Sequence, residues 1–254
     1  MALKTLISLL ILSFSLSSPA VTVISDLDDT IKITQVKTVW NYYNSIVGTR
    51  VFLGMDQLVR DYKDQNSQNK VIVLSGSPEV LRGAVNRLMT KNNIPADAIY
   101  LAGKPEKKME RLLSLAEEIN DDLVLIGDDQ EFDPSFYQEV KAKFPDKVKA
   151  IYIHQVNNRP VLPGQIGFIT AYEVAVYEAQ AGRLSNNNVE NVRSFIEGRL
   201  NLAPQDTLVT QRVSETLVPR WSKCPAISPL QSLPGDVDFT KQIEVILNRN
   251  CKSH

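Results

Sequence analysis

Acidic side chains directly follow two short apolar runs of the chain. Asp26 and Asp28 come after the run 21–24, and Asp128 comes after the run 123–126. Two like charges about 4 Å apart repel each other by roughly 4 kcal/mol at an effective dielectric of about 20, so a cation is expected between them. Oxygen ligands suit a hard divalent ion, and Mg²⁺ is the usual choice beside phosphate. The spacing therefore predicts carboxylate chemistry assisted by a metal ion.

Two other interpretations of the segment Asp26–Thr30 compete with this one. A calcium-binding loop of the EF-hand type also begins with spaced acids, but Ile31 stands where that loop needs glycine and Lys37 where it needs a bidentate glutamate. An aspartate-rich turn that binds nothing is the plainer alternative. The apolar strand predicted directly before the acids argues against such a turn.

A second group of polar residues follows the apolar run 71–74. Ser75 and Gly76 offer a hydroxyl and free backbone N–H groups at the start of a predicted helix, which is a favourable place for an anion. Ser77 is expected to cap that helix. Further along, Lys107 and Lys108 begin an amphipathic helical pattern.

The composition excludes several functional classes. The 254 residues contain 29 acidic and 28 basic side chains, which give a formal charge of −1, whereas nucleic-acid binders usually carry a basic excess. Only two histidines are present, so a zinc site or a Ser-His-Asp triad would depend on His154. The chemistry is therefore expected to rest on carboxylates.

The order of the elements predicts an α/β protein with three layers around a parallel sheet. Short apolar runs alternate with helical patterns, which is typical of strands joined by crossover helices. The predicted strands are 21–24, 71–74, 98–101, 123–126 and 148–153. The predicted helices are 55–65, 78–92, 105–119, 134–143 and 168–182, the last of them ended by Gly182.

The pattern changes after residue 184. A polar break is expected at Ser185–Asn188, followed by one or two helices, a proline-rich stretch and a final helix at 239–248. We therefore expect a catalytic domain over 21–184 and a C-terminal extension over 185–254 that packs on it.

The N-terminus predicts export. A basic start, the apolar run Leu6–Leu16 and small residues before Val21 indicate a secretory signal peptide over residues 1–20. The alternative is an uncleaved membrane anchor, since no charged residue occurs from 5 to 25. Export would make a disulfide between Cys224 and Cys251 plausible, with two unpaired thiols as the alternative.

The order of these motifs resembles the haloacid dehalogenase superfamily, whose phosphatases share four of them. The matching segments are, in order, Asp26–Thr30, Ser75, Lys108 (with Lys104 and Lys107 as alternatives) and Gly127–Asp128. Within the superfamily, residues 21–184 resemble the catalytic domain of the actin-patch type of phosphatidate phosphatase. That resemblance rests on the runs Val23–Lys32, Leu125–Pro134 and Ile151–Ile153. It implies a Rossmann-like fold with a small or absent cap.

The resemblance also implies a reaction through an aspartyl-phosphate. Asp26 is the expected nucleophile, and Asp28 is the expected acid that protonates the leaving group and the base that then activates water. Mg²⁺ is expected on Asp26, on the backbone carbonyl of Asp28 and on Asp128.

The remaining motif residues are expected to hold the phosphate or to support the site. The expected phosphate ligands are Thr30, Ser75, Gly76 and Lys108. Asp133 is expected to fix a metal-bound water or Lys108 from behind the metal ligands. Two positions depart from the usual family residues, namely Lys107 and His154, and Asp129 receives no role.

The expected substrate is a phosphomonoester, with phosphatidate at a membrane surface as the leading candidate. The short insert 33–53 leaves an open site, which favours a large or membrane-bound substrate, and Trp40, Tyr42 and Tyr43 either face a lipid or partner or pack in the core. A soluble phosphomonoester or a phosphoprotein is the second candidate. A catalytically silent binding module of the same fold is the third.

Overall fold

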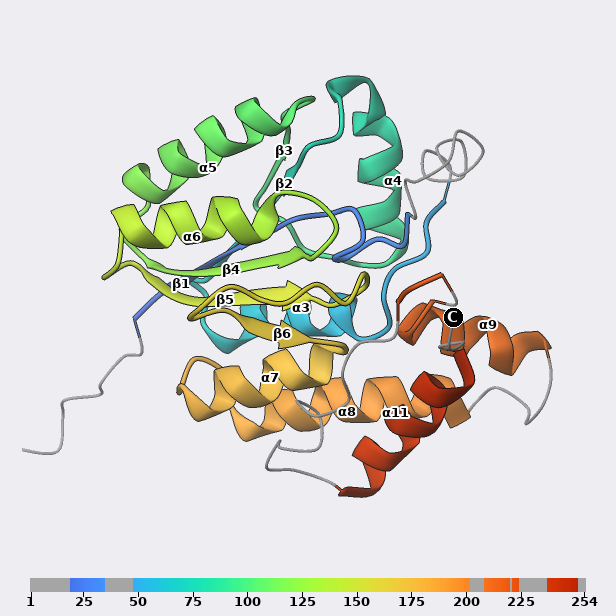
Figure 1. Cartoon of the computed structure of the whole chain (residues 1–254). Coiled ribbons are helices and arrows are strands. Elements are labelled where there is room, and N and C mark those ends of the chain that lie inside the picture. The colour runs from blue at the N-terminus through green and yellow to red at the C-terminus, as the bar shows by residue number, and fades with distance from the viewer. Residues whose placement is uncertain (1–18, 35–47, 202–207, 220, 224–236, 251–254) are drawn as a thin grey trace, which may run out of the picture.

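The computed structural model describes residues 19–34, 48–201, 208–219, 221–223 and 237–250. Six strands form one sheet in the order β3-β2-β1-β4-β5-β6, and all neighbours run parallel (Figure 1). The strands are β1 (Val21–Ser25), β2 (Lys70–Ser75), β3 (Ala98–Leu101), β4 (Asp122–Asp128), β5 (Val148–His154) and β6 (Ile166–Phe168). The predicted parallel α/β fold is confirmed.

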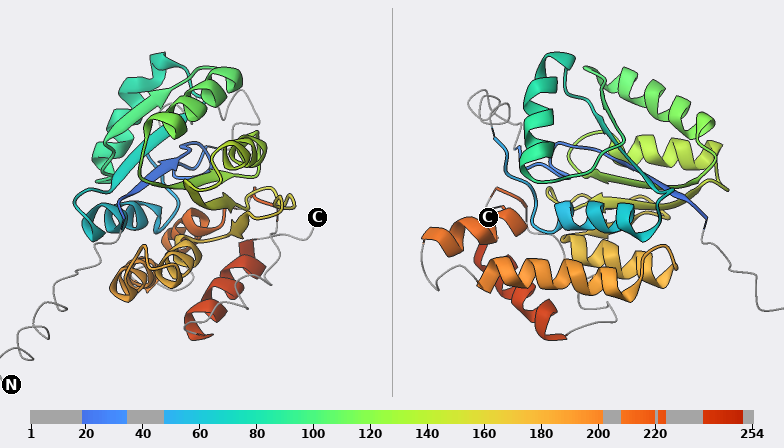
Figure 2. Two further views of the ribbon diagram at one scale, coloured as in Figure 1. Left: turned by 90° about the vertical axis from the view of Figure 1, so that its left-hand side faces the viewer. Right: turned by 180° about the vertical axis from the view of Figure 1, so that it is seen from behind.

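Helices cover both faces of this sheet, as Figures 1 and 2 show. On one face lie α3 (Met55–Gln65), α4 (Arg82–Lys91) and α7 (Ala171–Gln180), and on the other lie α5 (Pro105–Glu118) and α6 (Asp133–Lys143). The predicted three layers are therefore present.

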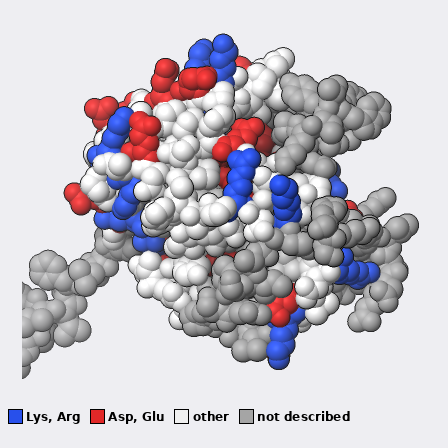
Figure 3. Space-filling model, in the orientation of Figure 1, with Lys and Arg blue, Asp and Glu red and all other residues white. Residues whose placement is uncertain are grey.

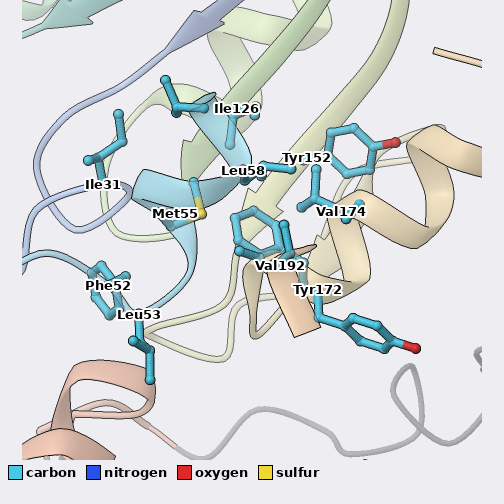
Figure 4. Packing of buried hydrophobic residues seen from close by; sticks show 14 of the residues in the cluster. Ile31, Phe52, Leu53, Met55, Leu58, Ile126, Tyr152, Tyr172, Val174 and Val192 are labelled. Carbon is cyan, nitrogen blue, oxygen red and sulfur yellow. The ribbon is translucent and has the colours of Figure 1, made fainter. Parts of the chain in front are cut away.

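Alternate strand residues supply the two halves of the core. Val23 of β1 belongs to the cluster under α3, α4 and α7, whereas its neighbour Ile24 belongs to the cluster under α5 and α6. Figure 4 shows the first cluster, in which Leu58 of α3 lies between Ile126 of β4 and Tyr152 of β5. Because both faces are buried, nearly every strand residue is apolar, and this is the pattern that made the strands recognisable in the sequence.

The centre of the sheet is the point where the strand order reverses. From β1 the chain builds outward through β2 and β3, and it then returns to place β4 on the other side of β1. Connections leave the carboxyl ends of β1 and β4 in opposite directions, which opens a crevice there. The residues that follow β1 and β4 are thereby brought side by side.

Two predicted helices differ from the structure. The segment 78–92 is divided into a short 3₁₀ helix η1 (Glu79–Leu81) and α4, and the expected helix 168–182 begins only at Ala171 because Phe168 belongs to β6. Strand β6 was missed in the sequence since it has only three residues, one of which is Gly167. Gly182 ends the helical turn as expected, with a φ of 72°.

The C-terminal helices are α8 (Asn186–Asn201), α9 (Leu208–Leu217) and α11 (Val237–Asn250). Helix α8 packs against α3 and α7 and buries Val192 and Ile196 in the same core cluster. The polar break expected at Ser185–Asn188 is wrong, because the Asn188 carboxamide accepts the Ser185 N–H at 2.9 Å and so holds the first turn of α8. The domain boundary after residue 184 stays a prediction.

Three predictions concern residues outside the described part of the chain. They are the signal peptide, of which 1–18 are not described, the aromatic residues Trp40, Tyr42 and Tyr43, and the pair Cys224 and Cys251. Among the described residues, no helix has both the length and the apolar character needed to cross a bilayer.

Candidate active site

The carboxyl ends of the two central strands bring together acids that lie far apart in the sequence. Asp26 follows β1, Asp128 ends β4, and Asp133 begins α6; all three are buried. One carboxylate oxygen from each lies within 4.8 Å of the others. The structure therefore joins two of the predicted metal ligands, Asp26 and Asp128, with Asp133, which was expected behind them. The side chain of Asp28 is not part of this cluster.

Lys108 is the lysine of the site. Its Nζ donates to Asp26 Oδ1 at 2.7 Å and to Asp133 Oδ1 at 2.5 Å, and the side chain is buried. Lys104 and Lys107, the two alternatives, are exposed. Lys108 precedes Leu112 by four residues and so points from α5 to the same side as the buried leucine.

Burial sets the electrostatics of this cluster. It raises the pKa of Asp26 and of Asp128 well above the ordinary value, and Asp133 adds to this because it repels both carboxylates, while Lys108 acts in the opposite direction. Burial alone would lower the pKa of Lys108, but Asp133 and Asp26 outweigh it and raise that pKa. One lysine thus faces three buried carboxyl groups, and a bound cation would stabilise their ionised forms.

A divalent cation fits this donor set. Asp133 Oδ2 is buried and has no hydrogen-bond partner among the described residues, so one acceptor of a clustered aspartate is left unsatisfied. The available donors are carboxylate oxygens, which suit Mg²⁺ and other hard dications. Asp26, Asp128 and Asp133 are therefore the residues that could hold a metal ion.

Gly127 is what lets Asp133 reach the cluster. A Cβ atom at this position would stand 2.5 Å from Asp133 Oδ2 and 2.8 Å from Cε2 of Tyr137. The Tyr137 hydroxyl in turn donates to the Ile126 carbonyl at 2.9 Å and holds α6 against β4. The Gly-Asp motif therefore has a steric reason, since any side chain at 127 would push Asp133 away.

Two serines bind the remaining predicted acid, Asp28. Its Oδ2 accepts from the Ser75 hydroxyl at 3.0 Å and from the Ser77 hydroxyl at 2.8 Å, and the backbone N–H of Ser77 donates to Ser75 Oγ at 3.0 Å. The expectation that Ser77 caps a helix is wrong, because η1 begins at Glu79 with no side-chain cap. The proline at 78 shifts the helix start and frees Ser77 to face Asp28.

These groups surround a cavity of about 460 Å³. Its lining contains the predicted residues Asp26, Asp28, Gly76, Lys108, Asp128 and Asp133. It also contains residues that sequence reasoning did not assign to the site, namely Asp29, Ser77, Pro78, Pro105, Gln130, Glu131, Phe132 and Phe136. Figure 3 shows acidic side chains beside basic ones near the carboxyl ends of the central strands.

Two predicted phosphate ligands do not line this cavity. Thr30 is fully buried, and its Oγ1 has no hydrogen-bond partner among the described residues. Ser75 is fully buried as well, although its hydroxyl contacts Asp28, which does line the cavity. The structure thus places Ser75 one contact away from the cavity and Thr30 in the core.

The acids next to the site residues hold loops in place. Asp129 accepts the N–H groups of Asn157 at 2.7 Å and Arg159 at 2.8 Å, which fixes the loop after β5. Asp29 accepts the side chain of Gln130 at 2.6 Å and so ties the loop after β1 to the loop after β4. These contacts give Asp129 a structural role.

His154 lies in the core and outside the cavity. Its ring packs between Phe52 and Phe168, with centroid distances of 4.3 and 4.9 Å, and Nδ1 is 2.8 Å from the Asp29 carbonyl. Burial lowers the pKa of His154 to about 4, so the ring is neutral at pH 7. Among the residues that the structure describes, no imidazole lines the cavity.

Known proteins show two kinds of similarity to this chain. The uncharacterized protein C29B5.04c of Schizosaccharomyces pombe is 29% identical over 154 residues, which are 54% of this chain and 25% of that protein. The chain thus spans about a quarter of the length of this relative. Chains of two solved structures of a Pnkp1/Rnl/Hen1 complex, one titled an RNA repair complex, are 20% and 18% identical with TM-scores of 0.37 and 0.33. Each covers 60% of this chain, which covers 47% and 44% of them.

The family similarity is more extensive. Residues 21–155, more than half of the 254, match the family described as the catalytic domain of phosphatidate phosphatase APP1. This range runs from β1 through β5 and includes the three clustered acids and Lys108. The chain belongs to the family of the phosphatidate phosphatase APP1 catalytic domain.

Proposed function

We propose that this protein is a metal-dependent phosphomonoester hydrolase whose leading substrate is phosphatidate, which it converts to diacylglycerol and phosphate. The observation that carries the proposal is the buried cluster of Asp26, Asp128 and Asp133 around Lys108, at the bottom of a cavity in the carboxyl edge of the sheet. A cluster of this kind costs stability unless it binds a cation. The family match supports phosphatidate as the substrate.

Asp26, Asp128 and Asp133 would hold the metal ion, and Mg²⁺ suits their oxygens best. When bound, such an ion neutralises charge on the three carboxylates and on the phosphate. The set of ligands expected from the sequence changes in one respect, since the Asp133 side chain joins Asp26 and Asp128.

The proposed nucleophile is Asp26. Its carboxylate oxygen forms a bond to phosphorus while the bond from phosphorus to the leaving-group oxygen breaks, which gives an aspartyl-phosphate and an alkoxide. Lys108 holds Asp26 Oδ1 at 2.7 Å and so restricts the rotation of this carboxylate. The positive charge of Lys108 also favours the build-up of charge on the phosphoryl oxygens.

Asp28 is the proposed acid and base. It lines the cavity two residues after Asp26 and gives its proton to the leaving alkoxide. It then takes a proton from the water that attacks the aspartyl-phosphate, and this restores both aspartates and releases phosphate. Ser75 and Ser77 hold Asp28 through its Oδ2.

The proposed phosphate-binding groups are Gly76 and Lys108, which line the cavity, and Ser75, whose hydroxyl contacts the lining residue Asp28. A Cβ atom at Gly76 would meet nothing within 4 Å, so the backbone here is open to a ligand. The Thr30 side chain is left out of this set because of its place in the core.

Phosphate release tests this proposal. Replacing Asp26 by asparagine, or adding EDTA, is expected to abolish hydrolysis of phosphatidate in mixed micelles. The matched control is Asp146→Asn, at an exposed aspartate between α6 and β5, which should keep full activity. Full activity of Asp26→Asn would exclude Asp26 as the nucleophile, whereas no activity of the unmodified protein on any phosphomonoester would leave a binding module as the function.

A soluble phosphomonoester is the second candidate. The specific observation in its favour is the cavity volume of about 460 Å³, which falls in the range of about 300–1,000 Å³ of small-molecule pockets. A panel of sugar phosphates, nucleotides and phosphopeptides, assayed beside phosphatidate, separates the two substrate classes by kcat/KM.

Export also stands as a proposal, supported by the sequence of residues 1–20. The mature chain would then begin at Val21, the first residue of β1. The intact mass of the protein from its native compartment tests this, and the same measurement with a thiol reagent decides whether Cys224 and Cys251 are joined.

A further inference from the structure

Exposed apolar side chains concentrate around the cavity. Among the described residues, four large hydrophobic side chains are exposed: Val80 by 86%, Phe132 by 50%, Leu162 by 37% and Val245 by 66%. The first three follow the carboxyl ends of β2, β4 and β5, which form the edge of the sheet that holds the cavity. Only Val245, on α11, lies elsewhere in the described part of the chain.

The first three residues, which we call the rim, are tied to the cavity by contacts. Phe132 lines the cavity and stacks on Phe136 with ring centroids 5.6 Å apart. Val80 stands on the turn η1, which begins directly after Pro78, another lining residue. The Leu162 N–H donates to the Gln165 side chain at 3.2 Å, and that side chain donates at 2.6 Å to the carbonyl of residue 134, two residues after Phe132.

The lining of the cavity decides where an acyl chain can go. Half of the residues that line it carry a charge, among them Asp26, Lys108 and Asp128. An acyl chain placed among these side chains would remove water from charged groups, and this costs free energy. We therefore expect the acyl chains of a phosphatidate outside the cavity, beyond Val80, Phe132 and Leu162.

We propose that the rim docks onto the surface of a lipid bilayer, so that a phosphate headgroup enters the cavity while its acyl chains stay in the membrane. The substrate part of this inference rests on the proposed function, whereas the docking part rests on the exposure of the rim. Three apolar side chains from three separate loops form a shallow apolar contact of the kind that enters the headgroup region.

The exposed charges at this edge of the sheet are compatible with an anionic surface. On the loops of the rim, Arg159 is offset by Glu131, and Glu79 is paired with Arg82. The start of α5, after β3, adds Lys104 and Lys107 against Glu106. The excess of one positive charge complements anionic headgroups but is small. Docking is therefore expected to depend mainly on apolar insertion and to weaken only slightly at high salt.

Vesicle sedimentation tests the docking directly. The Asp26→Asn protein is mixed with phosphatidylcholine vesicles that contain about one fifth phosphatidate, so that no turnover occurs. Adding Val80→Ser and Leu162→Ser should weaken sedimentation with the vesicles at least about tenfold, because two apolar side chains are lost from the contact. The matched control is Val245→Ser, which removes the exposed apolar side chain outside the rim and should change nothing. Equal binding by the rim variant, or no binding by the parent protein, would overturn the proposal.

Activity on two substrates separates docking from chemistry. In the active protein, Val80→Ser with Leu162→Ser should keep kcat/KM for p-nitrophenyl phosphate within about twofold and reduce phosphatidate hydrolysis in vesicles about tenfold. An equal loss on both substrates would mean that the rim acts through the site, which would overturn docking. If the unmodified protein hydrolyses p-nitrophenyl phosphate but not phosphatidate, the proposed substrate fails, while the sedimentation result still decides the docking.

Discussion

Two groups of buried aspartates lie at the same edge of the sheet and are stabilised differently. Asp26, Asp128 and Asp133 crowd together, with one oxygen of each within 4.8 Å of the others. Asp29 and Asp129, by contrast, each accept hydrogen bonds from neighbouring backbone N–H groups. Burial raises the pKa of both Asp128 and Asp129, so burial does not distinguish the two groups.

The two groups differ in what offsets the cost of burying their carboxylates. The N–H groups around Asp129 belong to the loop that it holds, so the folded chain itself satisfies this carboxylate. The crowded group has Lys108 and an unsatisfied oxygen of Asp133, and therefore needs a cation from outside. In this protein a buried acid indicates function when the fold leaves it without sufficient partners.

Replacing one aspartate of each group by asparagine compares them directly, and the largest expected effect is the loss of activity in Asp26→Asn. Asp26→Asn should lower kcat/KM by at least about a thousandfold, because the nucleophile is lost. It should leave the thermal unfolding temperature in metal-free buffer unchanged or higher, because one of three crowded charges is removed.

Asp129→Asn should behave in the opposite way. Its amide NH₂ would face a backbone N–H, so the free energy of unfolding should fall by about 1.5–3 kcal/mol while activity per folded molecule stays within a few fold. Urea unfolding and phosphate release measure both quantities. A stability loss in Asp26→Asn together with none in Asp129→Asn would refute the distinction between the two groups.

Metal binding should stabilise the folded protein only through Asp26, Asp128 and Asp133. Mg²⁺ at a hundred times its dissociation constant should raise the free energy of unfolding by about 2.7 kcal/mol. Asp128→Asn should lose most of this gain, whereas Asp129→Asn should keep it relative to its own metal-free state. Calorimetric scans at several Mg²⁺ concentrations measure the shift. An equal shift in Asp128→Asn would place the ion elsewhere.

The sequence predicts the strands, their parallel arrangement and the acids at their ends, because a doubly covered strand is apolar throughout and its end is marked by the first charge. Asp26 and Asp128 were identified in this way. The choice of Lys108 over Lys107 was also within reach, since only Lys108 shares the spacing of the buried Leu112.

Other parts of the site depend on contacts between distant segments. Asp133 joins the cluster because Gly127 leaves space for it, and this relation appears only once α6 is folded back on β4. Ser77 resembled a helix cap, but its hydroxyl faces Asp28, 49 residues away in the sequence. The side chain of Thr30 was assigned to phosphate by family pattern alone, and it lies in the core.

Glu173, away from the site, shares features with both groups: it accepts backbone N–H groups, as Asp129 does, and its pKa is raised by burial, as that of Asp128 is. Its Oε2 accepts the N–H groups of Ile169 at 2.9 Å and Thr170 at 2.6 Å, yet burial raises the pKa of Glu173 from 4.5 to about 7. Between pH 4.5 and about 7 the folded protein therefore keeps the carboxyl proton of Glu173, while the unfolded chain releases it. The contribution of Glu173 to the free energy of unfolding is full below pH 4.5 and is lost as the pH rises to about 7.

Glu173→Gln should remove this dependence, because glutamine accepts the same two hydrogen bonds without a charge. The variant should be more stable than the parent by about 3 kcal/mol at pH 8 and nearly equal to it at pH 4.5. Urea unfolding at the two pH values measures the difference. A difference between variant and parent that does not change with pH would show that the two backbone N–H groups keep the Glu173 carboxylate ionised in the folded protein.

The smallest expected effect concerns how Asp28 is held, since it belongs to the site but is held by side-chain hydroxyls. If Asp28 donates the proton to the leaving group, Ser77→Ala should matter most where that proton is needed. We expect kcat/KM to fall about tenfold, or about 1.4 kcal/mol, for the alkyl ester glycerol phosphate. It should fall less than about threefold for p-nitrophenyl phosphate, whose phenolate leaves without a proton. Ser77→Thr keeps the hydroxyl and should restore the alkyl ester rate. An equal loss on both esters would show that Ser77 binds phosphate instead of positioning Asp28, because a lost phosphate contact weakens every phosphomonoester alike.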